Sequence, residues 1–173
     1  MKKLVMILLL FISVFSFSNE NFTENEKNIA LKQFMEFQKA LKNKDINTLK
    51  NYIDNPVYGF NQIDGKSYQD YEIPVSHNDI VKYKSRFLDG IKEMTLLKVD
   101  LNSNTVKKYK KGDLEITADF STEESNENWG LNSDEKTFEV FYSYDDPDYP
   151  GYNRYVFKFE NNKLKLQALY VGP

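Results

Sequence analysis

The chain has 173 residues and a formal net charge of -3, with 40% apolar, 28% charged and 15% aromatic residues. This length suits one globular domain, and 13 Phe and 12 Tyr exclude a chain that is disordered throughout. The absence of Cys excludes a disulfide scaffold, a thiolate metal site and a Cys nucleophile. A mildly acidic chain is also a poor candidate for binding nucleic acid, which depends on neutralising phosphates.

Residues 1–18 have the pattern of a secretory signal peptide. Two lysines precede the apolar stretch Leu4–Phe17, which is shorter than the ~20 residues that a membrane-spanning helix needs. Ser16 and Ser18 fit the small-x-small cleavage pattern. We therefore expect a mature chain, residues 19–173, that forms a single domain. It would be periplasmic or extracellular and would have no stable membrane anchor.

The clearest helix pattern covers Thr23–Lys44. Thr23 and Glu26 have the spacing of a capping box at its start. Apolar residues recur at helical spacing along one side, and charged residues lie mostly on the other. We expect the apolar side to pack on a sheet, with Phe37 among the most buried residues and Lys39 in solvent.

Shorter elements follow this helix. Asp45 is expected to cap a second helix through Ile53, which Pro56 stops. Val57–Phe60 and Ile63–Tyr68 are expected to form a hairpin, because Asp64-Gly65 is a hairpin-turn dipeptide.

A third helix is expected over Ser76–Glu93. Ser76 and Asp79 form the cap pair, and apolar residues share one face. His77, at its start, is a conceivable base, but a surface residue at a helix start is expected. As the single His of the chain, it also lacks a second nitrogen ligand for zinc.

From Thr95 onward the apolar period falls to two, which indicates strands. A polar loop, Ser121–Lys136, interrupts the series and contains Trp129. The residues expected to share a face within each strand are Leu97, Val99 and Leu101; Leu114, Ile116 and Ala118; Phe138, Val140, Tyr142 and Tyr144; Tyr155, Phe157 and Phe159; and Leu164, Leu166, Ala168 and Tyr170.

Helices followed by a run of antiparallel strands give an α+β order. The segment Phe34–Asp45, with Leu49 and Ile53 behind it, and the final strand pair around Asn161-Asn162 resemble the NTF2-like superfamily, with its SnoaL-like and ketosteroid-isomerase-like folds. The resemblance implies N-terminal helices packed on a curved, mainly antiparallel sheet, as a cone with a pocket at its wide end. A cystatin-like sheet with one wrapping helix is the alternative.

The resemblance does not select an activity. Members of this superfamily use the pocket for small apolar ligands or catalysis, and others dimerise through the open sheet face. No residue here matches a catalytic motif of the family. Asp119, Glu139 and Tyr142 are conceivable acids and donors, but Glu139 is expected to face solvent, by alternation with its apolar neighbours.

We therefore expect an exported binding domain without catalytic activity and without a cofactor or metal. The alternative is a pocket enzyme of the isomerase or cyclase type. The partner would be a small molecule or a protein, including a second copy bound through the sheet face. Tyrosine suits binding surfaces, since it buries much area and keeps a polar tip. The candidate ligand-binding residues are Trp129, Tyr142, Tyr144, Tyr149 and Tyr152.

Charge is unevenly distributed along the chain. Lys82–Lys111 carries a net charge of +6, and Asp119–Asp148 carries -9. These stretches are expected to complement each other across strands, and the alternative is a polar rim that attracts a charged partner. Because 21 of the 23 basic residues are Lys, as an AT-rich bacterial genome would encode, lysine clusters carry no functional weight by composition alone.

One acidic segment, Asp145–Gly151, places three carboxylates within four residues. Calcium requires six to eight oxygen ligands, and this spacing is not that of an EF-hand. Since Asp and Pro are also common turn residues, a solvated loop between strands is expected.

Overall fold

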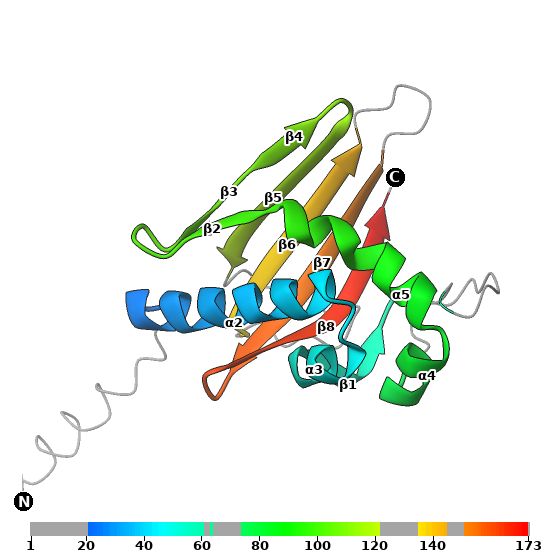
Figure 1. Ribbon diagram of the computed structural model, residues 1–173. Helices are drawn as coiled ribbons and strands as arrows, with labels where there is room; N and C mark the ends of the chain where they lie inside the picture. Colours follow the sequence, from blue (N-terminus) through cyan, green and yellow to red (C-terminus); the bar gives the residue numbers. More distant parts are fainter. Residues whose placement is uncertain (1–20, 61–62, 64–73, 122–134, 145–150, 173) are drawn as a thin grey trace, which may run out of the picture.

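The computed structural model describes residues 21–60, 63, 74–121, 135–144 and 151–172. Helices lie across one face of a curved sheet (Figure 1). The helical elements are α2 (Glu24–Lys42), α3 (Ile46–Leu49), η1 (Lys50–Tyr52), α4 (His77–Lys82), α5 (Lys84–Ile91) and η2 (Lys92–Leu96). The strands are β1 (Ile53–Tyr58), β2 (Lys98–Asp100), β3 (Thr105–Lys107), β4 (Tyr109–Lys111), β5 (Leu114–Ser121), β6 (Thr137–Tyr144), β7 (Gly151–Glu160) and β8 (Lys163–Gly172).

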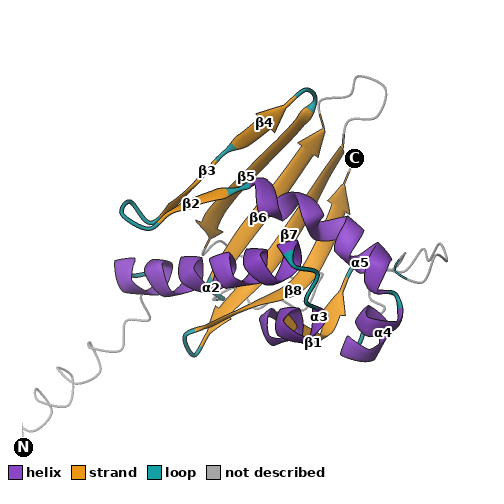
Figure 2. Cartoon of the chain, in the orientation of Figure 1, coloured by secondary structure: helices purple, strands orange, loops and turns teal. Residues whose placement is uncertain are grey.

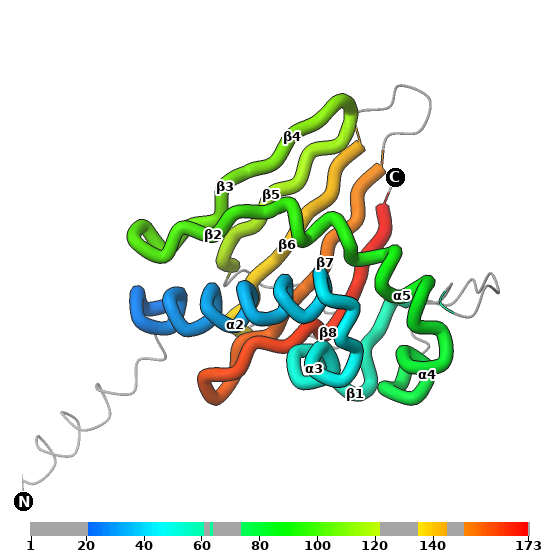
Figure 3. The backbone as a smooth tube through the Cα atoms, in the orientation of Figure 1, coloured from blue at the N-terminus to red at the C-terminus, as the bar shows by residue number. Residues whose placement is uncertain are grey.

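The main sheet has six strands in the order β1-β8-β7-β6-β5-β4, and β2 pairs with β3 separately. All neighbours in the main sheet are antiparallel except β1, which runs parallel to β8. The first and last strands of the chain therefore lie side by side (Figure 3). Figure 2 shows the helix layer in front of the strands. The predicted α+β class, with an N-terminal helix packed on a curved, mainly antiparallel sheet, is confirmed.

Helix α2 forms and packs as its sequence predicts. The Thr23 hydroxyl accepts from the Glu26 amide, and the Glu26 carboxylate accepts from the Thr23 amide, which completes the capping box. The Phe37 ring centroid lies 5.3 Å from that of Phe157 on β7, and Phe34 packs against Phe138 on β6. Phe37 is only 1% exposed, so the expected burial is confirmed.

The region after α2 differs from the prediction. The helical turn ends at Tyr52, and Ile53 begins strand β1, so Pro56 lies within a strand rather than stopping a helix. A proline is tolerated there because β1 is the edge strand of the sheet. Val57 forms an antiparallel bridge with Val75, which lies beyond the hairpin that the sequence predicts. The predicted turn Asp64-Gly65 lies outside the described residues.

The expected third helix is two helices. Its Ser76–Asp79 capping box is present. Tyr83, with φ -108° and ψ 31°, leaves the helical region, ends α4 and precedes α5. A 3₁₀ turn then extends beyond the predicted end at Glu93 to Leu96. Ile80 on α4 and Phe87, Leu88 and Ile91 on α5 are buried, whereas Val81 on α4 is exposed.

Strand β8 contains an irregularity that splits its predicted face. Phe157 pairs with Leu166, but Val156 pairs with Ala168, so Gln167 is an extra residue. Leu164 and Leu166 consequently face the helices, whereas Ala168 and Tyr170 lie on the opposite side of the sheet. The prediction that all four share one face is wrong, because an inserted residue shifts the alternation by one.

The end of β1 lies very close to β8. A Cβ atom on Gly59 would meet the Leu169 carbonyl oxygen at 1.8 Å, and Gly59 has φ +81°. Glycine is therefore required at this contact. Among the described residues, none of the helices has the length and apolarity needed to cross a bilayer. The expected signal peptide, residues 1–18, lies outside the described residues.

Candidate functional site on the outer face of the sheet

Two phenols connect the inner face of the sheet, which faces the helices, to the end of α5. The Tyr155 hydroxyl donates to the Gly90 carbonyl at 2.6 Å, and the Tyr142 hydroxyl donates to the Ile91 carbonyl at 3.4 Å. Burial raises the pKa of both phenols, and nearby Glu93 adds to the effect. Both side chains therefore stay protonated and serve as fixed donors between the sheet and the helix layer.

Tyr144 lies further along β6, at the rim of the inner face. It is 40% exposed. Partial burial and Glu93 raise its pKa. The inner face thus changes along β6 from the buried Tyr142 to a tyrosine that reaches solvent.

The outer face, which points away from the helices, carries a paired charge. Arg154 Nε donates to Glu139 Oε2 at 2.8 Å, and Arg154 Nη2 donates to Glu139 Oε1 at 2.6 Å. Thr137 donates a further hydrogen bond to Glu139 Oε1 at 3.1 Å. This fork-like contact is the strong form of an Arg–carboxylate interaction.

Glu139 is only 4% exposed, so the expectation that it faces solvent is wrong. Alternation places it on the outer face correctly, since it pairs across the strands with Val156. That face, however, is not uniformly exposed to solvent, because Thr137, Val156 and Ala168 are also buried there. The alternation of side chains along a strand predicts which face of the sheet a residue lies on. It does not predict how far neighbouring side chains bury that residue.

Two aromatic rings flank the Arg154 guanidinium. Its central carbon lies 5.8 Å from the Phe141 ring centroid and 5.7 Å from that of Tyr170. The bond to Glu139 raises the pKa of Arg154. Burial raises the pKa of Tyr170 to about 12. Arg154 remains a cation in a fixed orientation, and its side chain is 25% exposed.

More tyrosines lie on the same outer face. Tyr152 pairs with Gly172 and is 43% exposed. Its ring lies over that glycine, because a Cβ on Gly172 would meet the ring at 2.4 Å. Tyr58 on β1 pairs with Ala168 and is also exposed. We call this set the tyrosine–arginine face: Tyr58, Phe141, Tyr152, Arg154 and Tyr170.

The structure separates the predicted ligand-binding residues. Tyr142 lies in the core, Tyr144 lies on the inner face, and Tyr152 lies on the outer face. Trp129 and Tyr149 lie outside the described residues.

Sequence reasoning missed Arg154, Tyr170, Phe141 and Tyr58 as members of a surface. One signal was available: Arg154 is one of only two arginines in the chain, on the same strand face as Tyr152.

The remaining sequence candidates have structural partners or lie outside the described range. The His77 ring nitrogen Nε2 is 3.0 Å from the Ile53 carbonyl oxygen, and its amide donates to Asn55. His77 is the first residue of α4, as expected, and its half-buried ring joins α4 to β1. Asp119 accepts from the amide of Phe120. Residues 145–150 are not described, so the calcium question stays a prediction.

Among the described residues, no group of three or more His, Cys, Asp or Glu is placed to hold a metal ion. Comparisons with protein-family models, curated proteins and solved structures found no match.

Proposed function

We propose that this protein is an exported binding domain without catalytic chemistry of its own, and that it binds a partner protein on the tyrosine–arginine face. The observation that carries the proposal is Arg154, which is fixed by Glu139 and two aromatic rings and still reaches solvent. A cation held in this way loses little side-chain freedom on binding, because its orientation is already set.

The chemistry of the face suits a protein partner. Tyr and Arg are enriched among the residues that dominate binding energy in interfaces. Arg154 has five N–H donors, of which Glu139 takes two in the described part of the chain. The others suit carbonyl or carboxylate groups of a partner, while Tyr58 and Tyr152 offer apolar area with polar tips.

The competing function, a pocket enzyme, has less support. Such an enzyme needs a phenol or acid whose donor is aimed at the substrate. The hydroxyl groups of Tyr142 and Tyr155 instead donate their hydrogen bonds to the backbone carbonyls of Ile91 and Gly90. The NTF2-like architecture belongs to the proposal, and the packing of α2 on a curved sheet supports it. Export is supported by the sequence pattern of residues 1–18.

Thiol labelling tests the proposed surface, because the chain contains no Cys. Tyr152→Cys and Tyr144→Cys form a matched pair of single-cysteine variants, with similar exposure at the same end of the sheet but on opposite faces. Each variant is labelled after purification and again in the exported fraction of the native host. We expect the host environment to slow labelling at position 152 and to leave position 144 unchanged. Equal rates at both positions in both settings would contradict the proposal.

A further inference from the structure

The strands β2, β3 and β4 form a basic extension on the β5 side of the molecule (Figure 1). Residues 98–111 contain five lysines and one aspartate. We call this segment the lysine arm. In a chain this rich in Lys, the number of lysines alone does not indicate a function. Their positions in the structure are therefore what matters.

Within the arm, Lys98 and Lys107 lie directly opposite each other on paired strands. Directly opposed residues point to the same face, and opposed like charges destabilise a sheet. Both side chains are exposed, and neither has an ion-pair partner among the described residues. Their neighbours Val99 and Val106 form the other face of the hairpin and pack against the core. The hairpin therefore presents two like charges outward, with no counter-charge on the residues that the structure describes.

Two other lysines of the arm show that the chain can neutralise such charges. Lys108 and Lys110 share the carboxylate of Glu115 on β5. Within the part of the chain that the structure describes, Lys98 and Lys107, like Lys111 at the end of β4, have no carboxylate partner.

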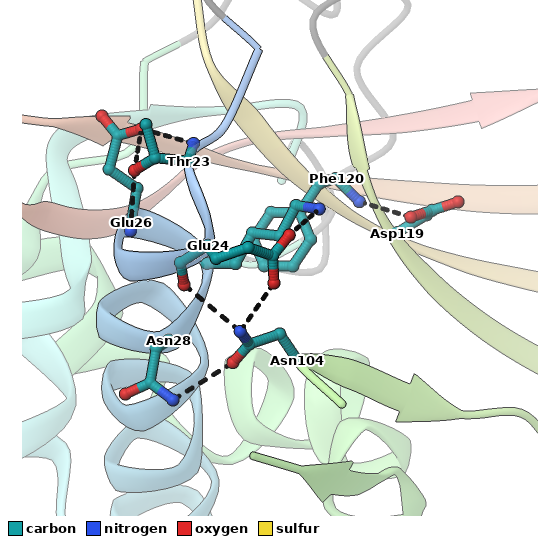
Figure 4. Close-up of polar contacts among 8 residues, drawn as sticks. Thr23, Glu24, Glu26, Asn28, Asn104, Asp119 and Phe120 are labelled. Atoms are coloured by element: carbon teal, nitrogen blue, oxygen red, sulfur yellow. Dashed lines mark hydrogen bonds and ion pairs between the residues drawn. The ribbon is translucent and has the colours of Figure 1, made fainter. Parts of the chain in front are cut away.

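The arm is held firmly in place. Its turn residue Asn104 donates to the carboxylate and the carbonyl of Glu24, and it accepts from Asn28 on α2 (Figure 4). These contacts fix the hairpin to the start of the long helix. Lys98 and Lys107 are therefore displayed by a rigid support rather than by a loose loop.

We infer that the lysine arm docks on the surface of an anionic lipid bilayer. This inference concerns a second surface and goes beyond the proposed function. The whole chain has a net charge of -3, so an anionic surface would be attracted by the local field of the arm and not by the protein's total charge. Lysine is a compact point charge on a flexible stem, which suits a diffuse surface potential better than a single forked contact.

An exposed apolar side chain supports a bilayer over a soluble polyanion. Leu96 is exposed beside the arm, two residues before Lys98, with the buried Leu97 between them. An apolar side chain next to lysines can enter the boundary between headgroups and acyl chains. A soluble acidic polymer offers no such region.

The test uses the expected mature chain, residues 19–173, so that the apolar stretch Leu4–Phe17 cannot itself bind lipid, and vesicles of phosphatidylcholine, either alone or mixed with phosphatidylglycerol. We expect binding to the mixed vesicles only, and we expect salt to weaken it. Each unit of positive charge removed from the arm should lower vesicle partitioning about fivefold. Lys39→Glu on the exposed side of α2 makes the same charge change away from the arm and should leave partitioning nearly unchanged.

Lys98→Glu separates this docking role from a structural one. The substitution places Glu opposite Lys107, so it should raise the urea midpoint of unfolding while it lowers vesicle partitioning. The inference is overturned if wild type shows no preference for anionic vesicles, or if Lys39→Glu weakens binding as much as Lys98→Glu. Equal affinity for soluble polyglutamate would also overturn it, because the arm would then recognise a polyanion rather than a bilayer.

Discussion

The Glu139–Arg154 pair is expected to contribute strongly to stability, because it neutralises a buried carboxylate on the outer face of the sheet. Arg154→Ala would leave a buried carboxylate without its partner, which typically lowers the free energy of unfolding by about 3–5 kcal/mol. Urea denaturation measures the change.

A double-mutant cycle provides the control for this prediction. In a Glu139→Gln background the buried charge is absent, so Arg154→Ala should cost clearly less than in the wild type. The same loss in both backgrounds would mean that the ion pair does not stabilise the outer face.

Buried phenols predict a loss of stability at alkaline pH. The pKa of Tyr170 in the folded chain is about 12, mainly because of burial, and an unfolded Tyr titrates near ~10. Burial shifts the pKa of Tyr142 and Tyr155 in the same direction. Because the folded pKa is the higher one, the contribution of Tyr170 is intact below about pH 10 and is lost as the pH rises through about 12. The loss from Tyr142 and Tyr155 begins at the same pH and extends to higher pH.

The urea midpoint should therefore fall between about pH 10 and about pH 12, and phenolate absorbance should rise as the chain unfolds. Tyr170→Phe removes one titrating group and should make the fall less steep. A midpoint that stays constant across this range would contradict the assigned burial of the phenols.

Among the elements, α2 gives the most direct test of how the layers pack. Phe37→Ala should lower the free energy of unfolding by about 3–5 kcal/mol, because its ring is enclosed between α2 and β7. Lys39→Ala, on the solvent side of the same helix, should change it by no more than about 0.5 kcal/mol. Chemical denaturation of both variants compares them, and equally small effects would mean that the helix is not docked on the sheet.

The elements also show what periodicity can predict. The apolar residues that recur at helical spacing along α2, together with its capping box, were sufficient to predict the helix, its buried side and its start. Periodicity did not reveal the break at Tyr83 or the extra residue at Gln167, because each is a local shift of one residue within a regular pattern. The sequence pattern placed a strand at Val57–Phe60 but missed that β1 begins at Ile53 and pairs with β8, which is more than 100 residues away in the chain.

The candidate site was harder to predict than the fold. The tyrosine–arginine face combines side chains from β1, β6, β7 and β8, and only their register brings them together. Tyr152 was found by its residue type. Arg154 was missed because its importance depends on Glu139, which alternation alone assigned to solvent.

The molecule as a whole has two proposed binding surfaces around a packed interior. Tyr142 and Tyr155 join the inner face of the sheet to the helices, the tyrosine–arginine face lies on the opposite side, and the lysine arm lies beyond β5. A protein partner and an anionic bilayer could then be bound at separate places on one small domain.

Photocrosslinking in the native host tests the central claim most directly, which is that the outer face of the sheet binds a protein. A photoreactive phenylalanine analogue replaces Tyr152 in one variant and Tyr144 in the other, and the crosslinked products are identified by mass. We expect position 152 to give a discrete adduct with a partner protein, which includes a second copy of this chain, and position 144 to give none. Adducts from position 144 alone, or identical adducts from both positions, would contradict it.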